Sequence, residues 1–344
     1  MSSAVSCKTF IPSFEKLLNR VEINSIDITP YSRRYLKHLL DHRKYYLHIY
    51  ATVLDCAKAK SNKPINELSL LDFGSGNGLL GLFARYCGFG EVMLCDINRN
   101  FVHASSVVAK LLKIQVDSFV NGDLTEVKKA LSPKVLDIMV GTDVIEHIYN
   151  LDNFFKDVCT INPRMVTVFT TASNPENLVK VKQLKKLQVK DELVGGDPED
   201  FALAGEEKHP SYLDMRRKII ELNFPAMKKD EVFQRAAASR GLIKEDIIKF
   251  VAGEPFQTDL PFCSAADSNT CHPETGSWSE RIISLQNYRD LYSRFSFNLA
   301  IENGFYNSFE DGISGKTKYF MNLLIKILGK KTAPFITLIG FPKA

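Results

Sequence analysis

The chain has 344 residues with 44 basic and 40 acidic side chains, so its formal net charge is +4. This length exceeds that of a minimal single core and is short for three domains, so we expect one enlarged domain or two domains. The apolar fraction of 45% and the charged fraction of 24% are typical of a soluble globular protein. The weak net charge gives no reason to expect a nucleic-acid partner.

Cysteine usage and hydropathy indicate the cellular compartment. The seven cysteines include no C-x-x-C pair, and several lie in apolar runs, which is typical of buried free thiols and favours a reducing, cytoplasmic location. The N-terminus lacks the basic-then-apolar pattern of a signal peptide. The most apolar stretch, residues 321–341, is interrupted by lysines and a proline. We therefore expect a helix and a strand there and no transmembrane segment.

The first 60 residues are expected to form an arm and a helix. Pro12 and Pro30 mark residues 1–30 as irregular. Between residues 31 and 60, apolar and aromatic residues recur at spacings of three and four, which predicts a helix. This segment carries five tyrosines and three histidines, and we expect most of these rings to pack in the core.

A glycine-rich turn follows the first predicted strand. Residues 68–73 form an apolar run with one acid, Asp72, and glycines follow at the alternate positions Gly74, Gly76 and Gly78. An apolar segment with helical spacing comes directly afterwards, so the stretch predicts a buried strand, a tight turn and a helix. Glycine permits a positive φ and a close ligand approach because it has no Cβ. The helix start offers free N–H groups to polar or anionic ligand groups.

Two classes of nucleoside ligand use such a turn. Gly76, Gly78 and Gly81 fit the G-x-G-x-x-G spacing of a dinucleotide site, so NAD or FAD has to be considered. However, the strand runs directly into Gly74, two residues before that spacing begins, and Asp72 would repel a pyrophosphate at close range. S-adenosylmethionine carries an ammonium group and no phosphate, so it meets no such repulsion.

Residues 72–78, D-F-G-S-G-N-G, match the pattern acid-x-Gly-x-Gly-x-Gly in full, and here the chain resembles the class I methyltransferase family. The resemblance covers roughly residues 40–175 and implies S-adenosylmethionine as cofactor, bound by Asp72, Gly74, Gly76 and Gly78. In this family a helix before the first strand often closes over the cofactor's amino-acid end or the substrate. For the rings of residues 31–60, closing over the cofactor or the substrate is therefore the alternative to packing in the core.

The next two predicted strands add further candidates for cofactor binding. Residues 91–96 form a buried strand ending in Asp96, twenty residues after Gly76, where a Rossmann-type site places a carboxylate on the ribose hydroxyls. The resemblance extends this contact to Ile97. After a helix at 101–112 and a strand at 116–120, it implies that Asp123 binds the adenine amino group while Leu124 packs on the ring. Alternatively, Asp123 is a turn residue after Asn-Gly.

The fourth strand, residues 135–140, leads to the segment D-V-I-E-H at 143–147. This segment resembles the fourth motif of a methyltransferase subgroup that includes the ubiquinone-biosynthesis O-methyltransferases. Asp143, Glu146 and His147 would cluster on a helical turn. In order of preference, they line the cofactor cleft, supply a general base with His147, or hold a divalent metal. A structural ion pair between Glu146 and His147 is also open.

We assign no metal, because further ligands such as His209 or His272 would be guesses. We take Asp143 as a cofactor contact, and His147 and Glu146 as catalytic.

A change of pattern follows the fifth strand, residues 165–171. Residues 176–280 contain helical segments and no convincing parallel strand, with helices expected at 179–190, 210–223, 230–240 and 243–252. An insertion at this place usually shapes the acceptor pocket in the resembled family, so we expect a substrate-binding lid. Its basic residues, including Arg216, Arg217 and Lys218, could instead form a solvated face.

A long loop, residues 253–280, ends this segment and contains His272 and the only tryptophan, Trp278. Long loops in compact domains are often functional, so these two residues, or His209, are candidates to meet the acceptor. Cys263, Cys271 and His272 do not have the spacing of a zinc site.

The predicted fold class is α/β, a Rossmann-like doubly wound seven-stranded methyltransferase sheet with its last strand antiparallel, plus a helical insertion. Helices at 287–292 and 318–328 and strands at 297–302 and 335–340 complete the sheet. The predicted domains are an N-terminal arm and helix (1–60), a cofactor-binding core (61–175), a helical lid (176–280) and a C-terminal completion of the sheet (281–344).

The predicted function is methyl transfer from S-adenosylmethionine to an oxygen of a small-molecule or sugar- or lipid-linked acceptor, without nucleic acid. The rival hypotheses are an NAD(P)-dependent oxidoreductase and a non-catalytic nucleoside-binding module. The sequence does not identify the acceptor, the atom methylated or the oligomeric state.

Overall fold

The computed structural model describes residues 5–131, 135–195, 210–256 and 268–343. The chain divides into two compact units. Unit 1 consists of residues 1–145, 155–171 and 288–344, and unit 2 consists of residues 146–154 and 172–287.

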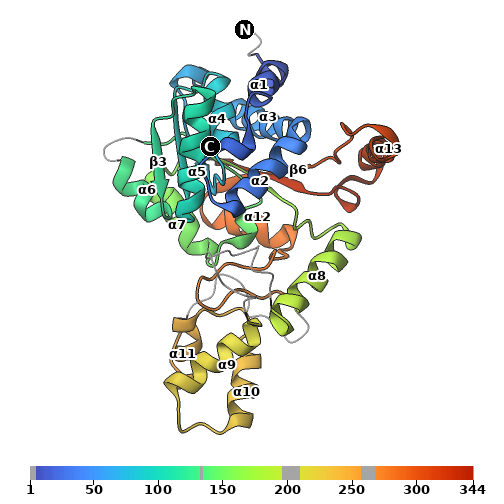
Figure 1. Cartoon of the computed structure of the whole chain (residues 1–344). Helices are drawn as coiled ribbons and strands as arrows, with labels where there is room; N and C mark the ends of the chain where they lie inside the picture. The colour runs from blue at the N-terminus through green and yellow to red at the C-terminus, as the bar shows by residue number, and fades with distance from the viewer. Residues whose placement is uncertain (1–4, 132–134, 196–209, 257–267, 344) are drawn as a thin grey trace. The chain divides into compact units, whose positions relative to one another are not determined.

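Unit 1 is built on a seven-stranded sheet with the order β3-β2-β1-β4-β5-β7-β6 (Figure 1). The strands are β1 (Ser69–Phe73), β2 (Glu91–Asp96), β3 (Ser118–Asn121), β4 (Ile138–Thr142), β5 (Val166–Thr171), β6 (Phe297–Asn303) and β7 (Ile336–Pro342). Strands β1–β5 are parallel, and β7 lies antiparallel between β5 and β6. The predicted α/β sheet with its last strand antiparallel is therefore confirmed.

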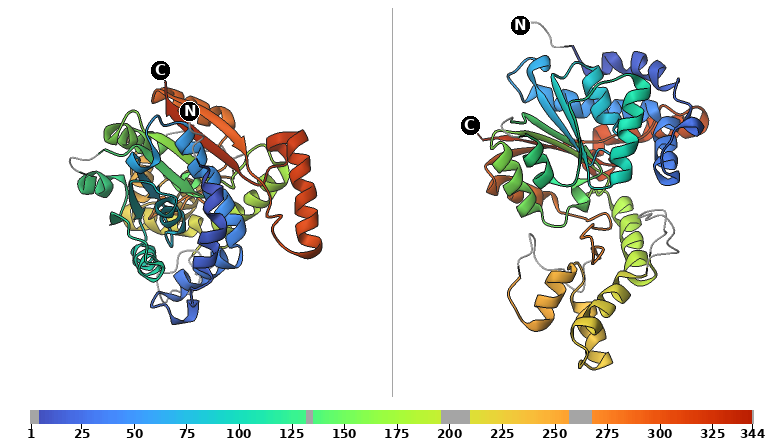
Figure 2. Two further views of the ribbon diagram at one scale, coloured as in Figure 1. Left: turned by 90° about the horizontal axis from the view of Figure 1, so that it is seen from above. Right: turned by 60° about the vertical axis from the view of Figure 1, so that its left-hand side comes forward.

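Helices cover both faces of this sheet (Figure 2). Unit 1 contains α1 (Ile11–Leu18), α2 (Pro30–Asp41), α3 (Arg43–Ala59), α4 (Leu79–Tyr86), α5 (Arg99–Leu112), α6 (Leu124–Leu131) and α13 (Gly312–Leu328). Helices α7 (Leu151–Ile161) and α12 (Leu285–Arg294) begin in unit 2 and end in unit 1. Apolar residues of α1–α5 and of the central strands form one buried cluster, because each helix turns an apolar stripe toward the apolar strands.

The N-terminal region differs from the expectation in two ways. Residues 11–18 are helical rather than irregular, since Ile11, Phe14 and Leu18 are buried at helical spacing. Residues 31–60 form two helices, α2 and α3, which meet at His42. Helix α3 lies in the core, and its buried residues contact strands β4 and β5.

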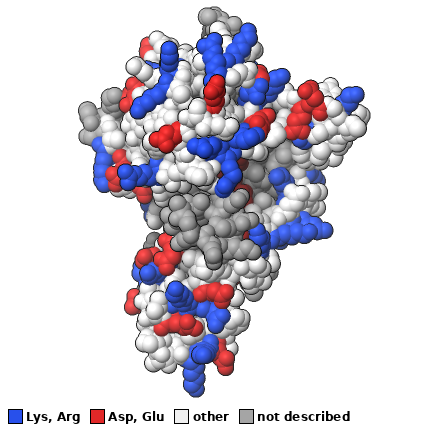
Figure 3. All heavy atoms as spheres, viewed as in Figure 1, with Lys and Arg blue, Asp and Glu red and all other residues white. Residues whose placement is uncertain are grey.

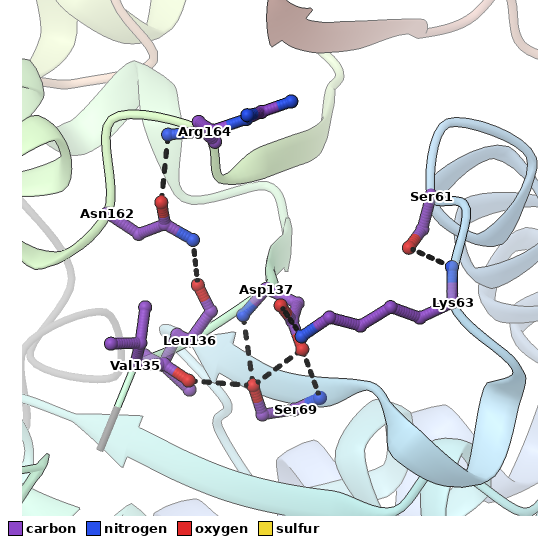
Figure 4. A network of polar contacts seen from close by, with 8 residues as sticks. All are labelled: Ser61, Lys63, Ser69, Val135, Leu136, Asp137, Asn162 and Arg164. Atoms are coloured by element: carbon purple, nitrogen blue, oxygen red, sulfur yellow. Dashed lines mark hydrogen bonds and ion pairs between the residues drawn. The ribbon is translucent and has the colours of Figure 1, made fainter.

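A polar network joins the amino ends of strands β1 and β4 (Figure 4). The Asp137 carboxylate accepts hydrogen bonds from Ser69 N at 3.1 Å and from Lys63 Nζ at 2.6 Å. Asp137 N donates to Ser69 Oγ at 3.0 Å. These bonds hold together the amino ends of two neighbouring strands. The glycine turn lies at the opposite, carboxyl ends of the strands.

Unit 2 contains the helices α8 (Leu178–Leu193), α9 (Tyr212–Asn223), α10 (Lys229–Ala238) and α11 (Lys244–Ala252). A small apolar cluster, with Ile219, Ile220 and Val232 at its centre, joins α9, α10 and α11. An isolated bridge between Cys271 and Trp278 is the β-pairing found in the described part of this unit.

Apart from Leu184, the buried residues of α8 are polar, which the sequence pattern did not predict. Gln188, Asp191 and Glu192 are buried, whereas Leu178 and Val179 are exposed. Glu192 forms a buried ion pair with Arg216, so this arginine is neither on a solvated face nor at an open acceptor surface. A buried carboxylate of this kind requires a cationic partner, and the partner comes from a helix distant in sequence.

Among the described residues, no helix has both the length and the apolar character needed to cross a bilayer. The six cysteines in the described segments are free thiols. The predicted domain boundaries and the lid role of residues 176–280 remain predictions.

Candidate functional site

The glycine turn leaves strand β1 at the carboxyl edge of the sheet and opens helix α4. Gly74, Gly76 and Gly78 have φ values of +69°, +52° and +80°, in the left-handed region that glycine adopts without strain. Gly74 N and Ser75 N both donate to Cys95 O, at 2.9 and 3.0 Å, which fastens the turn to strand β2. The turn therefore needs its glycines for backbone conformation.

Close packing adds a second requirement for glycine here. A Cβ on Gly78 would lie 2.6 Å from Leu94 Cδ2 and 2.7 Å from Ser105 Cβ, and a Cβ on Gly74 would lie 2.5 Å from Val144 Cγ2. A Cβ on Gly76 would lie 3.0 Å from the Tyr35 ring of α2. The backbone of the turn is thus approached from several sides, and the ring of Tyr35 lies over Gly76.

Asp72 is buried at the end of strand β1. Its Oδ2 accepts a hydrogen bond from Gly81 N at 2.8 Å. Burial raises the pKa of Asp72 to about 7; the bond from Gly81 opposes this shift, and the nearby charge of Asp96 adds to it. Near neutral pH this carboxyl group is therefore partly protonated, and a cation beside it would favour the ionised form.

Asp96, at the end of strand β2, holds the turn from the other side. Its Oδ2 accepts from Gly76 N at 2.8 Å, and its Oδ1 accepts from Asn98 N at 2.8 Å. Burial raises the pKa of Asp96 above its usual range against these two bonds. The next residue, Ile97, is 80% exposed, so its side chain is open to a ligand bound at this edge.

Asp143 follows strand β4 with a φ of +50°, which is unusual for a residue with a side chain. Its N–H donates to Thr170 O at 3.0 Å. Burial, together with the charge of Asp143, raises the pKa of Tyr46 to about 12 and that of Tyr45 further. Asp143 therefore lies close to tyrosine rings of helix α3, at the carboxyl edge of the sheet.

Helices α2 and α3 bring several rings to this edge. Tyr35 packs on Phe101 with 5.4 Å between ring centroids, and His38 Nε2 lies 2.9 Å from Tyr46 Oη. Asn77 of the turn is buried and donates from Nδ2 to Ser32 O of α2 at 2.9 Å. The N-terminal helices are thus tied directly to the glycine turn.

Asp123 and Leu124 have structural roles at the start of helix α6. Asp123 Oδ1 accepts from Thr125 N at 2.7 Å, as expected of a turn aspartate. Leu124 is buried within unit 1, so its side chain is part of the core. Their predicted contacts with the adenine group remain predictions.

His147 and Glu146 belong to unit 2 and lie in a single 3-10 turn, Ile145–His147. His147 Nδ1 lies 2.7 Å from Trp278 O. A carbonyl oxygen only accepts, so Nδ1 carries a proton and Nε2 presents its lone pair in the neutral ring. His147 Nε2 lies 3.9 Å from Glu280 Oε1, where a protonated ring would be attracted. Glu146 is fully buried.

The other candidate acceptor contacts behave differently. His209 and Cys263 lie outside the described residues. Trp278 is buried: its Nε1 donates to Tyr149 O at 3.1 Å, and the Arg281 guanidinium lies 4.1 Å from its ring centroid. Its ring therefore packs within unit 2, and its predicted contact with an acceptor remains a prediction.

Within the described segments, no group of three His, Cys, Asp or Glu side chains is placed to hold a metal ion. The metal hypothesis for Asp143, Glu146 and His147 therefore gains no support.

Comparison with known proteins identifies the class of this domain. Residues 66–215 match the family model described as a methyltransferase domain. The chain is 28% identical over 104 residues to a ubiquinone biosynthesis O-methyltransferase of Pelagibacter ubique, covering 28% of this chain and 38% of that protein. It is 28% identical over 111 residues to a ribosomal protein L11 methyltransferase of Prochlorococcus marinus, covering 32% of this chain and 37% of that protein. The chain spans less than half the length of these curated relatives.

The structure of the plantazolicin methyltransferase BpumL in complex with SAH is similar at a TM-score of 0.40 and 10% identity, over 98% of this chain and 99% of that one. This similarity is too low to bear on function.

The family match and the seven-stranded sheet together define a class I methyltransferase domain dependent on S-adenosylmethionine. Residues 66–215 match this family's model, in agreement with the sequence analysis, and S-adenosylmethionine is the cofactor of such a domain. The glycine turn fits that cofactor, because it combines a backbone that a ligand can approach closely with the two acids Asp72 and Asp96.

Two residues of this edge were given no role of their own by the sequence analysis. Asn77 lies inside the glycine motif as a variable position, so no pattern marked it. Tyr35 was counted among the rings expected to pack in the core. The signal that could have indicated its place was the density of rings in α2 and α3 immediately before the glycine strand.

Proposed function

We propose that the chain transfers the methyl group of S-adenosylmethionine to an oxygen of a small-molecule or sugar- or lipid-linked acceptor. The observation that carries this proposal is the glycine turn, whose Gly76 amide is held by Asp96 while buried Asp72 ends the adjacent strand. The O-methyltransferase among the relatives favours oxygen as the acceptor atom, and the ribosomal protein methyltransferase makes a protein acceptor the alternative.

In this proposal, the residues of the carboxyl edge share the binding of the cofactor. Asp96 accepts hydrogen bonds from the ribose hydroxyls beside the two amides that it already binds, and Ile97 contacts the base with its exposed side chain. Asp72 and Asp143 place negative charge near the cationic end, and the backbone of Gly74, Gly76 and Gly78 permits close approach. At the start of helix α6, Asp123 binds the adenine amino group and Leu124 packs on the adenine ring.

The rival assignment to an NAD(P)-dependent oxidoreductase is less well supported. A pyrophosphate at this turn would lie close to Asp72, whose carboxyl group is buried at the end of strand β1 and would repel it when ionised. A non-catalytic nucleoside-binding module would need the same turn but no base. His147 distinguishes the catalytic proposal from that one.

We assign His147 as the general base of the reaction. The Trp278 carbonyl fixes the proton on Nδ1, so Nε2 can take a proton from the acceptor hydroxyl, and Glu280 stabilises the resulting imidazolium. Glu146 positions the turn that carries His147. When bound, the cofactor supplies an electrophilic methyl group on a sulfonium. With the cofactor bound, the acceptor oxygen would take the methyl group, and the electrons of the carbon–sulfur bond would remain on sulfur.

Most of the rate enhancement in such a displacement comes from positioning the acceptor and excluding water, because the leaving group is already good. Loss of the base alone therefore affects turnover and leaves cofactor binding intact.

Calorimetry with S-adenosylhomocysteine and with NAD⁺ tests the cofactor class, and a methyl-release assay on acceptor pools tests catalysis. We expect binding of the first ligand only. Asp96→Asn should weaken it at least about tenfold, since a charge-assisted hydrogen bond contributes roughly 1.5–3 kcal/mol. Asp137→Asn is the matched control, because it changes a strand-end aspartate at the opposite edge of the sheet and should leave this affinity unchanged.

His147→Gln should lower kcat at least about a hundredfold while the affinity for S-adenosylhomocysteine stays the same. Binding of NAD⁺ in place of S-adenosylhomocysteine would overturn the proposed class. An unchanged kcat for His147→Gln would remove this residue from the mechanism without affecting the cofactor assignment.

A further inference from the structure

Helix α13 stands apart from the core of unit 1. In the chain it follows strand β6 and precedes strand β7, and it projects beyond the sheet (Figures 1 and 2). The segment just before it holds it in place: Asn322 Oδ1 accepts from Tyr306 N at 2.7 Å, and Asn322 Nδ2 donates to Tyr306 O at 3.1 Å. Lys318 pairs with Glu310 on the same side of the helix. One face of α13 is therefore fixed, and the opposite face points to solvent.

This outer face is mainly apolar, with Thr317 between Ile313 and Phe320. Ile313, Phe320 and Ile327 are 84%, 70% and 79% exposed, and Leu324, at the same helical spacing, is also exposed. The face continues sideways through a further set of exposed apolar residues: Tyr319, Leu323 and Leu328. A single exposed apolar residue needs no explanation, but a continuous stripe on one helix marks an interaction surface.

The charge of the helix is all of one sign. Residues 312–331 contain five lysines and no aspartate or glutamate, although the whole chain is nearly balanced at 44 basic and 40 acidic residues. Lys316 and Lys326 are exposed on the helix itself, and Lys330 and Lys331 follow its C-terminal end. On the face of the molecule drawn in Figure 3, basic and acidic side chains are interspersed.

From this arrangement we propose that α13 is an interfacial helix that docks unit 1 on an anionic lipid surface. Its apolar face enters the boundary between headgroups and acyl chains, and its lysines contact the anionic headgroups. The helix has 17 residues and a length of about 26 Å at 1.5 Å per residue, so it lies in the plane of the surface instead of crossing the bilayer. Lysine stems can extend along the apolar face while their ammonium groups reach the headgroups.

Charge favours this occupant over a second copy of the chain. Two α13 helices packed face to face would bring the exposed Lys316 and Lys326 of one copy near those of the other, whereas Lys318 is paired with Glu310 within each copy. An anionic bilayer supplies negative charge and an apolar interior in one surface. The proposal does not depend on the proposed activity, because it concerns binding to lipid and is measured without catalysis.

Flotation of the full-length protein with vesicles tests the proposal. Vesicles of phosphatidylcholine with 30% phosphatidylglycerol should bind the protein at least tenfold more tightly than vesicles of phosphatidylcholine alone, and added salt should weaken this binding. The double variant Phe320→Ser, Ile327→Ser should lose at least tenfold in partitioning, since two large apolar side chains no longer enter the bilayer. Lys316→Gln, Lys326→Gln should lose binding to the anionic vesicles several-fold.

Matched controls come from exposed residues elsewhere in the chain. Leu222→Ser removes an exposed leucine of helix α9, and Lys182→Gln, Lys186→Gln neutralises two exposed lysines of helix α8. These variants should bind the vesicles like the natural chain. All substituted residues are exposed, so the unfolding midpoint should not change, and this is measured for each variant.

Three outcomes would overturn the proposal. One is the absence of binding to anionic vesicles. Another is equal loss of binding in the α13 variants and their controls. The third is a stable dimer in light scattering that dissociates in Phe320→Ser, Ile327→Ser, because a second copy would then cover this face.

Discussion

The two units of this chain are stabilised in different ways. Unit 1 has a large apolar core in which helices α1–α5 pack on a mainly parallel sheet, and its buried acids stand at the ends of strands. Unit 2 has a small apolar cluster and a buried polar network in which Glu192 binds Arg216 at its Nη2 and accepts from Thr270 Oγ1 at 2.7 Å. Arg216 also donates from Nε to Ala236 O at 2.8 Å.

This difference shows in which unit the local sequence indicates which residues are buried. In unit 1 the large buried cluster is apolar, and the buried acids Asp72 and Asp96 stand at the ends of strands, so both features can be recognised from neighbouring residues. In unit 2 a buried residue can be charged, and its burial depends on a partner 24 residues away in sequence. The three variants below test this contrast.

Removal of the buried cation should have the largest effect. Arg216→Ala removes the bidentate partner of buried Glu192 and leaves Arg240, whose Nε lies 3.3 Å from Glu192 Oε1, as a cationic partner. The loss should lower the free energy of unfolding of unit 2 by about 3 kcal/mol. Arg217→Ala is the control, because it removes an exposed ion pair with Asp214 and should cost at most about 1 kcal/mol. Urea unfolding followed by fluorescence measures both, since the only tryptophan, Trp278, is buried in unit 2. Equal losses in the two variants would show that the buried pair contributes no more than an exposed one.

The glycine turn should give the next largest effect. Gly78→Ala places a Cβ 2.6 Å from Leu94 Cδ2 at a φ of +80°, so the turn has to shift. We expect at least a tenfold loss of affinity for S-adenosylhomocysteine in calorimetry, in addition to lower stability. Gly88→Ala also imposes a left-handed φ, of +97°, but its Cβ meets no atom within 4 Å. It should therefore cost about 1 kcal/mol of stability and leave the affinity intact. A similar loss of affinity in Gly88→Ala would show that close packing at Gly78 is not the cause of the effect.

The smallest expected effect is a pH dependence at Asp72. With a pKa of about 7 without ligand, this carboxyl group is mostly protonated at pH 6 and mostly ionised at pH 8. A cationic ligand binds the ionised form better, so affinity for S-adenosylmethionine should fall by up to about tenfold from pH 8 to pH 6. Asp72→Asn should bind more weakly and lose this dependence. The ligand's own titration is common to both proteins, so the difference between their slopes isolates Asp72. Parallel slopes would exclude this carboxyl group as the titrating one.

Much of the sheet and of the cofactor edge followed from the sequence by itself. Apolar runs ending in Asp72 and Asp96, the alternate glycines and the strand and helix periods of residues 61–175 are local patterns, and local patterns encode strands, turns and helices directly. The final antiparallel strand was predicted from the resemblance to a known family, and the pairing of β7 with β5 and β6 bears it out. The roles assigned to individual residues at this edge are still predictions.

Only the tertiary structure decided which side chains meet across long separations. It placed the Tyr35 ring over Gly76, turned the polar side of α8 inward onto Arg216, and left the apolar face of α13 without cover in unit 1. Helical periodicity predicts that a helix has an apolar and a polar face. It does not predict which face is buried, because that depends on the element packed against the helix. Where the partner lies far along the chain, as for Glu192 and Arg216, burial reverses the usual preference and no local pattern records it.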